Sequence, residues 1–314
     1  MYKILKKKIL ATGLVLFDIE AKRISKACKP GQFLIVRLDE CAERIPLTIC
    51  DSDSEKGTIT IVVQIVGVST KKISELETND YFEDVVGPLG NPSDLVGLNK
   101  NDLNEKHILF IAGGLGAAPV YPQAKYLSSE GVDFEVIIGA KNKNLLILED
   151  EYKKLNRNIY ICTDDFSYGF KGPVTNVLKK LCDGTIRDEE YKCGDGNIVK
   201  GKDIYKDIDK KEFKHIVAIG SAVMMKYTCM LTRELNIKTI VSMNTLMVDG
   251  TGMCGACRLM VGDKLKFCCI DGPEFDGHMI DFDSVITRLS QYKDEESRVL
   301  LKYNEGSTHK GNCY

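Results

Sequence analysis

Hydrophobic and polar positions follow two different rhythms along the 314-residue chain. In the first part, short β-branched or aromatic runs alternate with charged, glycine or proline turns, and these runs cover residues 2–20, 33–38, 44–50, 57–66 and 81–90. Short strands at regular spacing are typical of a small antiparallel barrel. Residues 1–100 are therefore expected to form a β-barrel domain.

Residues 101–240 show the second rhythm, in which apolar strands alternate with helical segments. The expected strands are 107–114, 132–140, 158–165, 215–220 and 238–244, with helices at 117–131, 148–156 and 223–235. This alternation predicts a doubly wound parallel sheet. The polar stretch 183–214 is expected to be a solvated excursion between two sheet strands. Residues 241–290 would form a third, smaller module and residues 291–314 a frayed or partner-bound tail.

Composition narrows the class of protein. The 43 basic and 45 acidic residues nearly cancel, to a net charge of −2, so nothing favours a nucleic-acid partner. The N-terminal lysine-rich stretch contains no apolar run long enough to span a membrane and no small-residue cleavage site. We therefore expect a cytoplasmic protein without a membrane partner.

The twelve cysteines are numerous for such a chain. Eight are scattered without the spacing of ligands, and most of these are expected to be reduced and buried. The other four lie between residues 254 and 269, and only they are close enough in sequence to indicate a metal site.

The spacing of this cysteine-rich segment favours an iron–sulfur cluster. Cys254, Cys257 and Cys269 read C-x2-C-x11-C, and Asp249 precedes the first by five positions. With a cysteine in place of the aspartate, the pattern would be that of a plant-type [2Fe–2S] loop. Two alternatives stay open. One is a zinc site that uses both Cys268 and Cys269, although neighbouring residues in extended chain point in opposite directions, with His278 as a substitute ligand. The other is no metal at all.

A glycine turn follows the first strand of the predicted parallel sheet. The segment IAGGLGAAP (111–119) contains Gly113, Gly114 and Gly116. Glycines at this place let the backbone approach a pyrophosphate, and the helix N-terminus favours negative charge. The spacing differs from G-x-G-x-x-G, so a tight turn without a ligand is the alternative.

Two segments of the predicted barrel carry groups suited to a flavin. Arg44 precedes Pro46 in strand-like sequence, where it can pair with a phosphate. Gly67, Ser69 and Thr70 form a glycine turn with two hydroxyl groups. Either segment alone fits an ordinary strand and turn, but together, before a nucleotide-type domain, they indicate a flavin.

A further polar group follows the third strand of the parallel sheet. Ligands of open sheets bind beyond the carboxyl ends of the strands, so Asp164, Asp165 and Ser167 can meet a ribose or a base there. A plain surface turn is the alternative.

Taken together, these motifs resemble a known family. Residues 242–283 closely resemble the cluster module of the small (alpha) subunit of NADH-dependent reduced ferredoxin:NADP oxidoreductases, also called ferredoxin–NADP reductase subunit alpha or sulfide dehydrogenase subunit beta. More distantly, the chain is similar to the electron-transfer subunit of dihydroorotate dehydrogenase, within the ferredoxin–NADP reductase superfamily. The likeness covers essentially the whole chain and runs through RIPLTICD, VQIVGVST, VVGPLGNPS, IAGGLGAAPVYPQAK, TDDFSYGFKGPVT and AIGSAVMMK.

The resemblance implies an FAD-binding barrel at 1–100, a nicotinamide-nucleotide domain at 101–240 and a [2Fe–2S] module at 241–290. It implies cluster ligation by Asp249, Cys254, Cys257 and Cys269. The matching cofactor positions are Arg44, Pro46, Leu47 and Thr48 in the flavin segment, Gly67, Ser69 and Thr70 in its phosphate loop, Gly113, Gly114, Gly116 and Pro119 in the nicotinamide turn, and Asp164, Asp165 and Gly220 near that turn. Ser221 and Ala222 depart from the family, which commonly has a Gly-Pro pair there.

The implied activity is electron transfer from NAD(P)H through FAD and the cluster to a larger flavin and iron–sulfur subunit, which would handle ferredoxin and NADP in an electron-bifurcating heterodimer. No side chain is required as a catalytic acid or base. The alternatives are a small subunit of a sulfide dehydrogenase or sulfur reductase, and a zinc-stabilised binding module without enzymatic activity.

Overall fold

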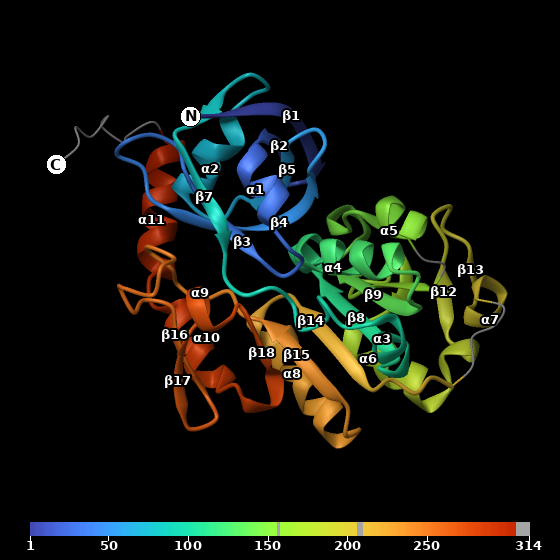
Figure 1. Cartoon of the computed structure of the whole chain (residues 1–314). Coiled ribbons are helices and arrows are strands. Elements are labelled where there is room, and N and C mark those ends of the chain that lie inside the picture. Colours follow the sequence, from blue (N-terminus) through green and yellow to red (C-terminus); the bar gives the residue numbers. More distant parts are fainter. Residues whose placement is uncertain (156–157, 206–209, 306–314) are drawn as a thin grey trace. The chain divides into compact units, whose positions relative to one another are not determined.

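The computed structural model describes residues 1–155, 158–205 and 210–305 (Figure 1). The chain divides into two compact units. The first unit comprises Met1–Asn91, Asn244–Pro273 and Asp281–Tyr314, and the second comprises Pro92–Met243 and Glu274–Ile280. The chain therefore crosses from one unit to the other four times, and the cysteine-rich segment belongs to the same unit as the N-terminal strands.

The first unit is built on a seven-stranded antiparallel sheet that curls into a nearly closed barrel (Figure 1), which confirms the predicted fold class. The sheet order is β6-β1-β2-β5-β4-β3-β7. Alternate side chains of its strands point inward, where Phe17, Leu34 and Ile61 are fully buried. The strands are β1 (Tyr2–Ala11), β2 (Leu14–Glu20), β3 (Phe33–Arg37), β4 (Ile45–Asp53), β5 (Thr58–Gln64), β6 (Tyr81–Phe82) and β7 (Asp84–Leu89), with helices α1 (Lys22–Ala27) and α2 (Val68–Glu75).

The stretch 2–20, expected as one strand, is a hairpin of β1 and β2. Gly13 turns the chain with φ = +75°, a backbone conformation that glycine adopts without steric cost. The two halves then pair antiparallel, with Lys7 opposite Phe17.

The C-terminal part of the first unit carries the cysteine-rich segment between a loop and a short hairpin. Its elements are β16 (Arg258–Val261), β17 (Lys264–Phe267), α9 (Cys268–Asp271), α10 (Phe282–Ser290) and α11 (Lys293–Asn304). Residues 293–304, expected as part of a tail, form a helix in which Tyr303 donates a hydrogen bond to Glu75 at 3.0 Å.

The second unit is a nine-stranded mixed sheet in the order β13-β12-β11-β10-β9-β8-β14-β15-β18. Strands β11, β10, β9, β8, β14 and β15 run parallel, as predicted. The strands are β8 (Ile108–Gly113), β9 (Phe134–Ala140), β10 (Ile159–Thr163), β11 (Gly169–Lys171), β12 (Glu190–Lys192), β13 (Ile198–Lys200), β14 (His215–Ile219), β15 (Lys238–Ser242) and β18 (Glu274–Asp276). The helices are α3 (Lys100–Glu105), α4 (Ala117–Ser129), α5 (Glu149–Leu155), α6 (Val174–Asp183), α7 (Gly201–Ile204) and α8 (Ala222–Glu234), with short 3₁₀ turns at Gly114–Gly116, Lys143–Leu145, Ile186–Asp188 and Gly277–Met279.

The order of these strands creates a topological switch point between β8 and β14. From β8 the chain proceeds through β9 and β10 to one side, and it then returns to β14 on the other side of β8. In open parallel sheets, ligands bind at such a point, beyond the carboxyl ends of the strands. The glycine turn and Gly220 follow these two strands directly.

The expectation of a solvated excursion at 183–214 was wrong for its described part. Residues 190–200 form a hairpin, β12 and β13, that extends the sheet beyond β11. Tyr191 and Tyr205 pack with Phe170, with ring centroids 5.1 and 5.9 Å from that of Phe170. These packed aromatic rings anchor a segment whose composition is otherwise polar.

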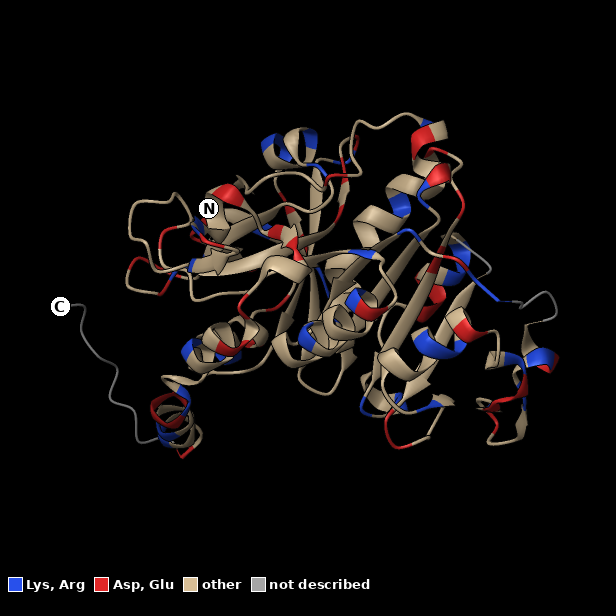
Figure 2. Cartoon of the chain, turned by 90° about the horizontal axis from the view of Figure 1, so that it is seen from below, with Lys and Arg blue, Asp and Glu red and all other residues tan. Residues whose placement is uncertain are grey.

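Charges of both signs are interspersed on the helices and loops (Figure 2). Among the described residues, no helix is both long enough and apolar enough to cross a membrane.

Candidate functional site

The first part of the cysteine-rich segment, which we call the cluster loop (residues 249–258), is organised around Asp249. The carboxylate accepts hydrogen bonds from the backbone amides of Thr251 (2.8 Å) and Cys254 (3.0 Å). These amides, the one of Thr251 foremost, lower the pKa of Asp249, so the carboxylate stays ionised. The loop thus holds an oxygen ligand and the first thiol of the motif side by side.

The second pair of candidate ligands is buried. Cys257 and Cys269 are each 2% exposed, and their sulfur atoms lie 3.3 Å apart. Burial, followed by the neighbouring Cys257, raises the pKa of Cys269 to about 12. The buried Cys269 thiol therefore resists ionisation unless a cation binds it, because the thiolate is the form that ligates metals.

The donor set fits a two-iron cluster better than a single ion. Among the described residues, no group of three or more His, Cys, Asp or Glu side chains is placed to hold a metal ion. A [2Fe–2S] cluster instead requires two protein ligands on each of its two irons. Two thiolates on one metal at about 2.3 Å in tetrahedral geometry would lie about 3.8 Å apart, near the 3.3 Å between Cys257 and Cys269. Asp249 and Cys254 form the other pair.

The two additional residues of the zinc alternative are engaged elsewhere. His278 shares a hydrogen bond of 3.0 Å with Thr232 in the second unit. Cys268 is fully buried, and its thiol lies beside Thr245, whose hydroxyl donates to the Cys257 carbonyl at 3.4 Å. The structure also corrects the assumption of extended chain here, because Cys268 and Cys269 begin α9.

The cluster loop packs against the barrel strand that pairs with the predicted flavin segment. A Cβ on Gly250 would lie 2.5 Å from the Ile35 side chain, so only glycine (φ = +75°) fits there. In the register of β3 and β4, Ile35 is the partner of Pro46. Neighbouring strands are about 4.8 Å apart, so the first unit brings the cluster loop close to residues 44–48.

The two predicted flavin segments also meet. Glu43, next to Arg44, accepts a hydrogen bond of 2.6 Å from the Ser69 hydroxyl. The Thr70 hydroxyl accepts from the amide of Gly67 at 3.0 Å, which closes the turn that begins α2. The remaining members, Leu47 and Thr48, lie on β4 opposite Leu34 and Phe33.

The predicted nicotinamide turn lies at the switch point of the second unit. A Cβ on Gly116 would lie 1.9 Å from the carbonyl oxygen of Ile219, so the turn and the end of β14 approach as closely as backbones can. Cβ atoms on Gly113 and Gly220 would both collide with the sulfur of Met224. Gly114 (φ = +57°) has open space around it, and Pro119 lies in the first turn of α4.

Asp164 and Asp165 lie farther along the same edge, after β10. This strand is separated from β8 by β9, a distance of about 10 Å. Both carboxylates are exposed, and Asp165 accepts a hydrogen bond from the Ser167 amide at 2.9 Å. The structure therefore places them along the edge at which the glycine turn lies, outside the turn itself.

Sequence reasoning missed two features of these sites. Ser221 caps α8 by accepting a hydrogen bond from the Met224 amide at 3.2 Å, a role that serine before a helical run could have indicated. Arg288 on α10 binds carbonyl groups of the cluster loop. No local sequence pattern could have indicated this contact, because the residues lie 30 or more positions apart in the sequence.

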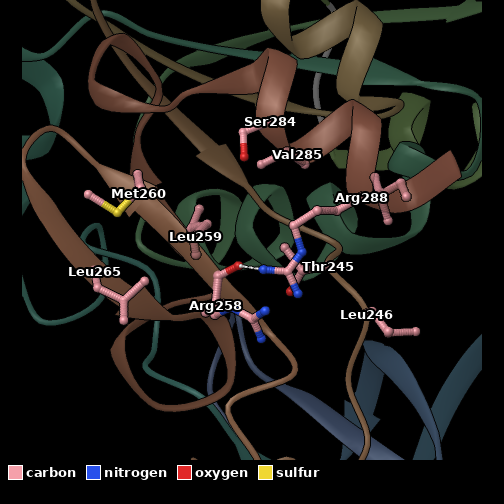
Figure 3. A pocket seen from close by; sticks show the side chains of 10 residues that line it. Thr245, Leu246, Arg258, Leu259, Met260, Leu265, Ser284, Val285 and Arg288 are labelled. Atoms are coloured by element: carbon pink, nitrogen blue, oxygen red, sulfur yellow. Dashed lines mark hydrogen bonds between the residues drawn. The ribbon is translucent and has the colours of Figure 1, made fainter. Parts of the chain in front are cut away.

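A pocket of about 190 Å³ lies beside the cluster loop, between the β16–β17 hairpin and α10 (Figure 3). It is mainly apolar, with two guanidinium groups at its wall. Its lining residues are Thr245, Leu246, Arg258, Leu259, Met260, Leu265, Ser284, Val285, Arg288 and Leu289.

Comparisons with known proteins agree with this geometry. Residues 244–281 match the iron–sulfur cluster binding domain of dihydroorotate dehydrogenase B. The chain is 46% identical over its whole length to an uncharacterized protein in the adh 3′ region of Clostridium beijerinckii, of which it covers 98%. It is 38% identical, over 94% of its own length and 92% of the relative's, to the homologue of the dihydroorotate dehydrogenase B (NAD(+)) electron transfer subunit from Thermotoga maritima.

A solved structure of the NADH-dependent reduced ferredoxin–NADP oxidoreductase, which gives insights into flavin-based electron bifurcation, is also similar. The superposition has a TM-score of 0.81 at 36% sequence identity, and it covers 97% of this chain and 98% of the chain in that structure. The fold and the cluster segment define an electron-transfer subunit of an oxidoreductase, related to ferredoxin reductases. The chain belongs to the family of dihydroorotate dehydrogenase B electron-transfer subunits and their homologues.

Proposed function

We propose that this chain passes electrons from NADH through FAD and a [2Fe–2S] cluster to a larger partner subunit. The observation that carries the proposal is the arrangement of four donors in two pairs, Asp249 with Cys254 and Cys257 with Cys269, within the matched cluster domain. FAD would occupy the barrel at Arg44 and the turn at 67–70, and the nucleotide would occupy the switch point of the second unit.

In this proposal the chain's residues bind and orient, because the flavin, when bound, supplies the conversion of a hydride into single electrons and the cluster supplies one-electron transfer. Arg44 is exposed and forms no ion pair with a described residue, so its guanidinium is available to a phosphate. At the switch point, Gly116 and the start of α4 offer backbone amides to the pyrophosphate. No side chain needs to accept or donate a proton during hydride transfer.

NADH is the expected nucleotide. The Lys143 ammonium group donates a hydrogen bond of 3.0 Å to the carbonyl of Gly194 and lies 5.4 Å from the Tyr168 ring centroid. It is thereby drawn away from a 2′-phosphate, and the exposed carboxylates of Asp164 and Asp165 would repel such a group. Acidic side chains at this edge suit a ribose hydroxyl instead.

The partner would receive electrons at the cluster loop. Cys254 is exposed, and the neighbouring Met253 is 89% exposed. By analogy with the NADH-dependent reduced ferredoxin–NADP oxidoreductase, we propose a heterodimer with a larger flavin and iron–sulfur subunit that acts on ferredoxin and NADP and that bifurcates electrons. We also propose a cytoplasmic location, because the many free thiols suit a reducing compartment.

Iron and flavin analysis tests the proposal directly. The anaerobically purified protein should hold about two irons and one FAD per chain. Cys257→Ser should lose the iron and keep the flavin. Cys229→Ser, a matched change at a buried cysteine of the second unit, should keep both. Colourless protein, or zinc in place of iron, would contradict the proposal.

A further inference from the structure

Two arginines hold carbonyl groups of the cluster loop from its outer side. The Arg288 guanidinium donates to the carbonyl of Ala256 at 2.9 Å and, as Figure 3 shows, to that of Arg258 at 3.0 Å. The Arg258 guanidinium donates to the carbonyl of Gly255 at 3.1 Å. Arg288, on α10, therefore holds the carbonyl of the residue before Cys257 and the carbonyl of the residue after it.

These contacts determine where the amide groups of the loop point. In a trans peptide the N–H lies opposite the C=O, so a carbonyl held outward turns the next N–H inward. The Gly255 carbonyl shows the result, because the amide of Ala256, in the same peptide plane, lies 3.5 Å from the Cys254 sulfur. By the same geometry, Arg288 fixes the plane that carries the amide of Cys257, whereas the amide of Leu259 faces β17, where Lys266 is its partner.

Amide hydrogen bonds to cluster sulfurs stabilise the more negative, reduced state and so raise the reduction potential. A guanidinium is suited to hold two carbonyls at once, because its donors form a rigid planar fork, whereas a lysine offers a compact point charge. Arg288 donates through two different nitrogens, Nη1 and Nη2.

We propose that Arg288 is a positioning residue for the cluster. Its fork holds the carbonyls of the residues before and after Cys257, directs the Cys257 amide to the cluster sulfurs and raises the potential at which the cluster accepts an electron. The inference rests on the proposed function, since it requires a cluster in the loop.

Arg288→Lys and Arg288→Gln in the cluster-loaded protein separate the fork from the charge. In a redox titration followed by EPR, we expect both variants to lower the ratio of reduced to oxidised cluster about tenfold at a given solution potential. This corresponds to a reduction potential about 59 mV lower for a one-electron couple. Arg298→Lys and Arg298→Gln make the same changes at an exposed arginine of α11, and they should titrate like the unaltered protein.

An Arg288→Lys protein with the unaltered potential would overturn the proposal, because charge alone would then suffice. Unaltered potentials in both Arg288 variants would overturn it as well. If a variant does not retain enough cluster to titrate, the rate of iron release to a chelator decides, and we expect about tenfold faster release from Arg288→Lys than from Arg298→Lys. Equal rates would contradict the proposal, and an unaltered protein without iron would overturn the proposed function itself.

Discussion

A buried carboxyl group in the second unit should make the stability of this protein fall as the pH rises. Glu274, on β18, accepts a hydrogen bond of 2.5 Å from the Gln123 amide, and the carbonyl oxygen of that amide accepts one of 3.0 Å from the Ser93 hydroxyl. Burial, and then the charge of Asp94, raise the pKa of Glu274 to about 7 from 4.5.

The sign of the effect follows from the protons bound in each state. Below pH 4.5 the Glu274 carboxyl is protonated in both the folded and the unfolded chain. Between pH 4.5 and 7 the unfolded chain releases this proton while the folded chain keeps it, so the free energy of unfolding decreases as pH rises. A difference of 2.5 pKa units is worth about 3 kcal/mol at about 1.4 kcal/mol per unit, lost in full above pH 7.

Glu274→Gln removes the titration and keeps the shape of the side chain. Relative to the unaltered protein, the variant should gain about 3 kcal/mol between pH 5 and pH 8, which is about 6–12 °C in Tm for a unit of this size. The assay is thermal unfolding of both proteins across this range. Glu130→Gln, at the exposed end of α4, is the control and should follow the unaltered protein. Parallel profiles for Glu274→Gln and the unaltered protein would refute the reasoning.

Three further predictions concern the cofactor sites. Gly116→Ala places a Cβ 1.9 Å from a backbone oxygen of β14, so it should lower the free energy of unfolding by more than about 3 kcal/mol and abolish NADH binding. Gly114→Ala has open space around its Cβ and should cost only about 1–2 kcal/mol for its positive φ. Calorimetry compares the stabilities of the two variants, and NADH titration compares their affinities. Asp249→Cys should retain iron but change the EPR signal and the potential, because a thiolate is a softer ligand than a carboxylate, and unchanged spectra would remove Asp249 from the ligand set. Asp164→Asn should raise the ratio of kcat/KM for NADPH to that for NADH about tenfold by removing a charge that opposes a 2′-phosphate, and an unchanged ratio would contradict its placement near the ribose.

Much of the fold could be predicted from the sequence because both sheets have a strong apolar rhythm. The strands of the parallel sheet are nearly continuous apolar runs, such as 108–113 and 134–140, as expected for strands covered on both faces. The hairpin at 2–20 was missed because its turn signal is a single glycine, Gly13, between two runs that both read as strand.

The strands in segment 183–214 could not be predicted from the hydrophobic pattern. Its strands β12 and β13 are three residues each, too short for a periodicity to register. What fixes them is the packing of Tyr191 and Tyr205 against Phe170, and such packing depends on residues more than 20 positions apart.

For the candidate sites, the spacing of residues indicated the cluster segment, which the matched domain covers, and proposed the other cofactor segments, but it did not indicate how the folded chain holds them. The glycine turn and the cluster motif are local patterns, so both were visible. The contacts of Arg288 with the cluster loop and of Gly250 with Ile35 arise only when distant segments fold together. The start of α9 at Cys268 was not predicted either. The residues before it form strand β17, so the sequence there reads as extended chain.

Anaerobic reduction by NADH, followed by optical and EPR spectroscopy on one sample, tests the central claim most directly. We predict that NADH bleaches the flavin absorbance and produces the EPR signal of one reduced [2Fe–2S] cluster per chain. In the Cys257→Ser variant, NADH should bleach the flavin absorbance without producing this EPR signal. Flavin bleaching without a cluster signal in the unaltered protein, or no response to NADH, would contradict the account.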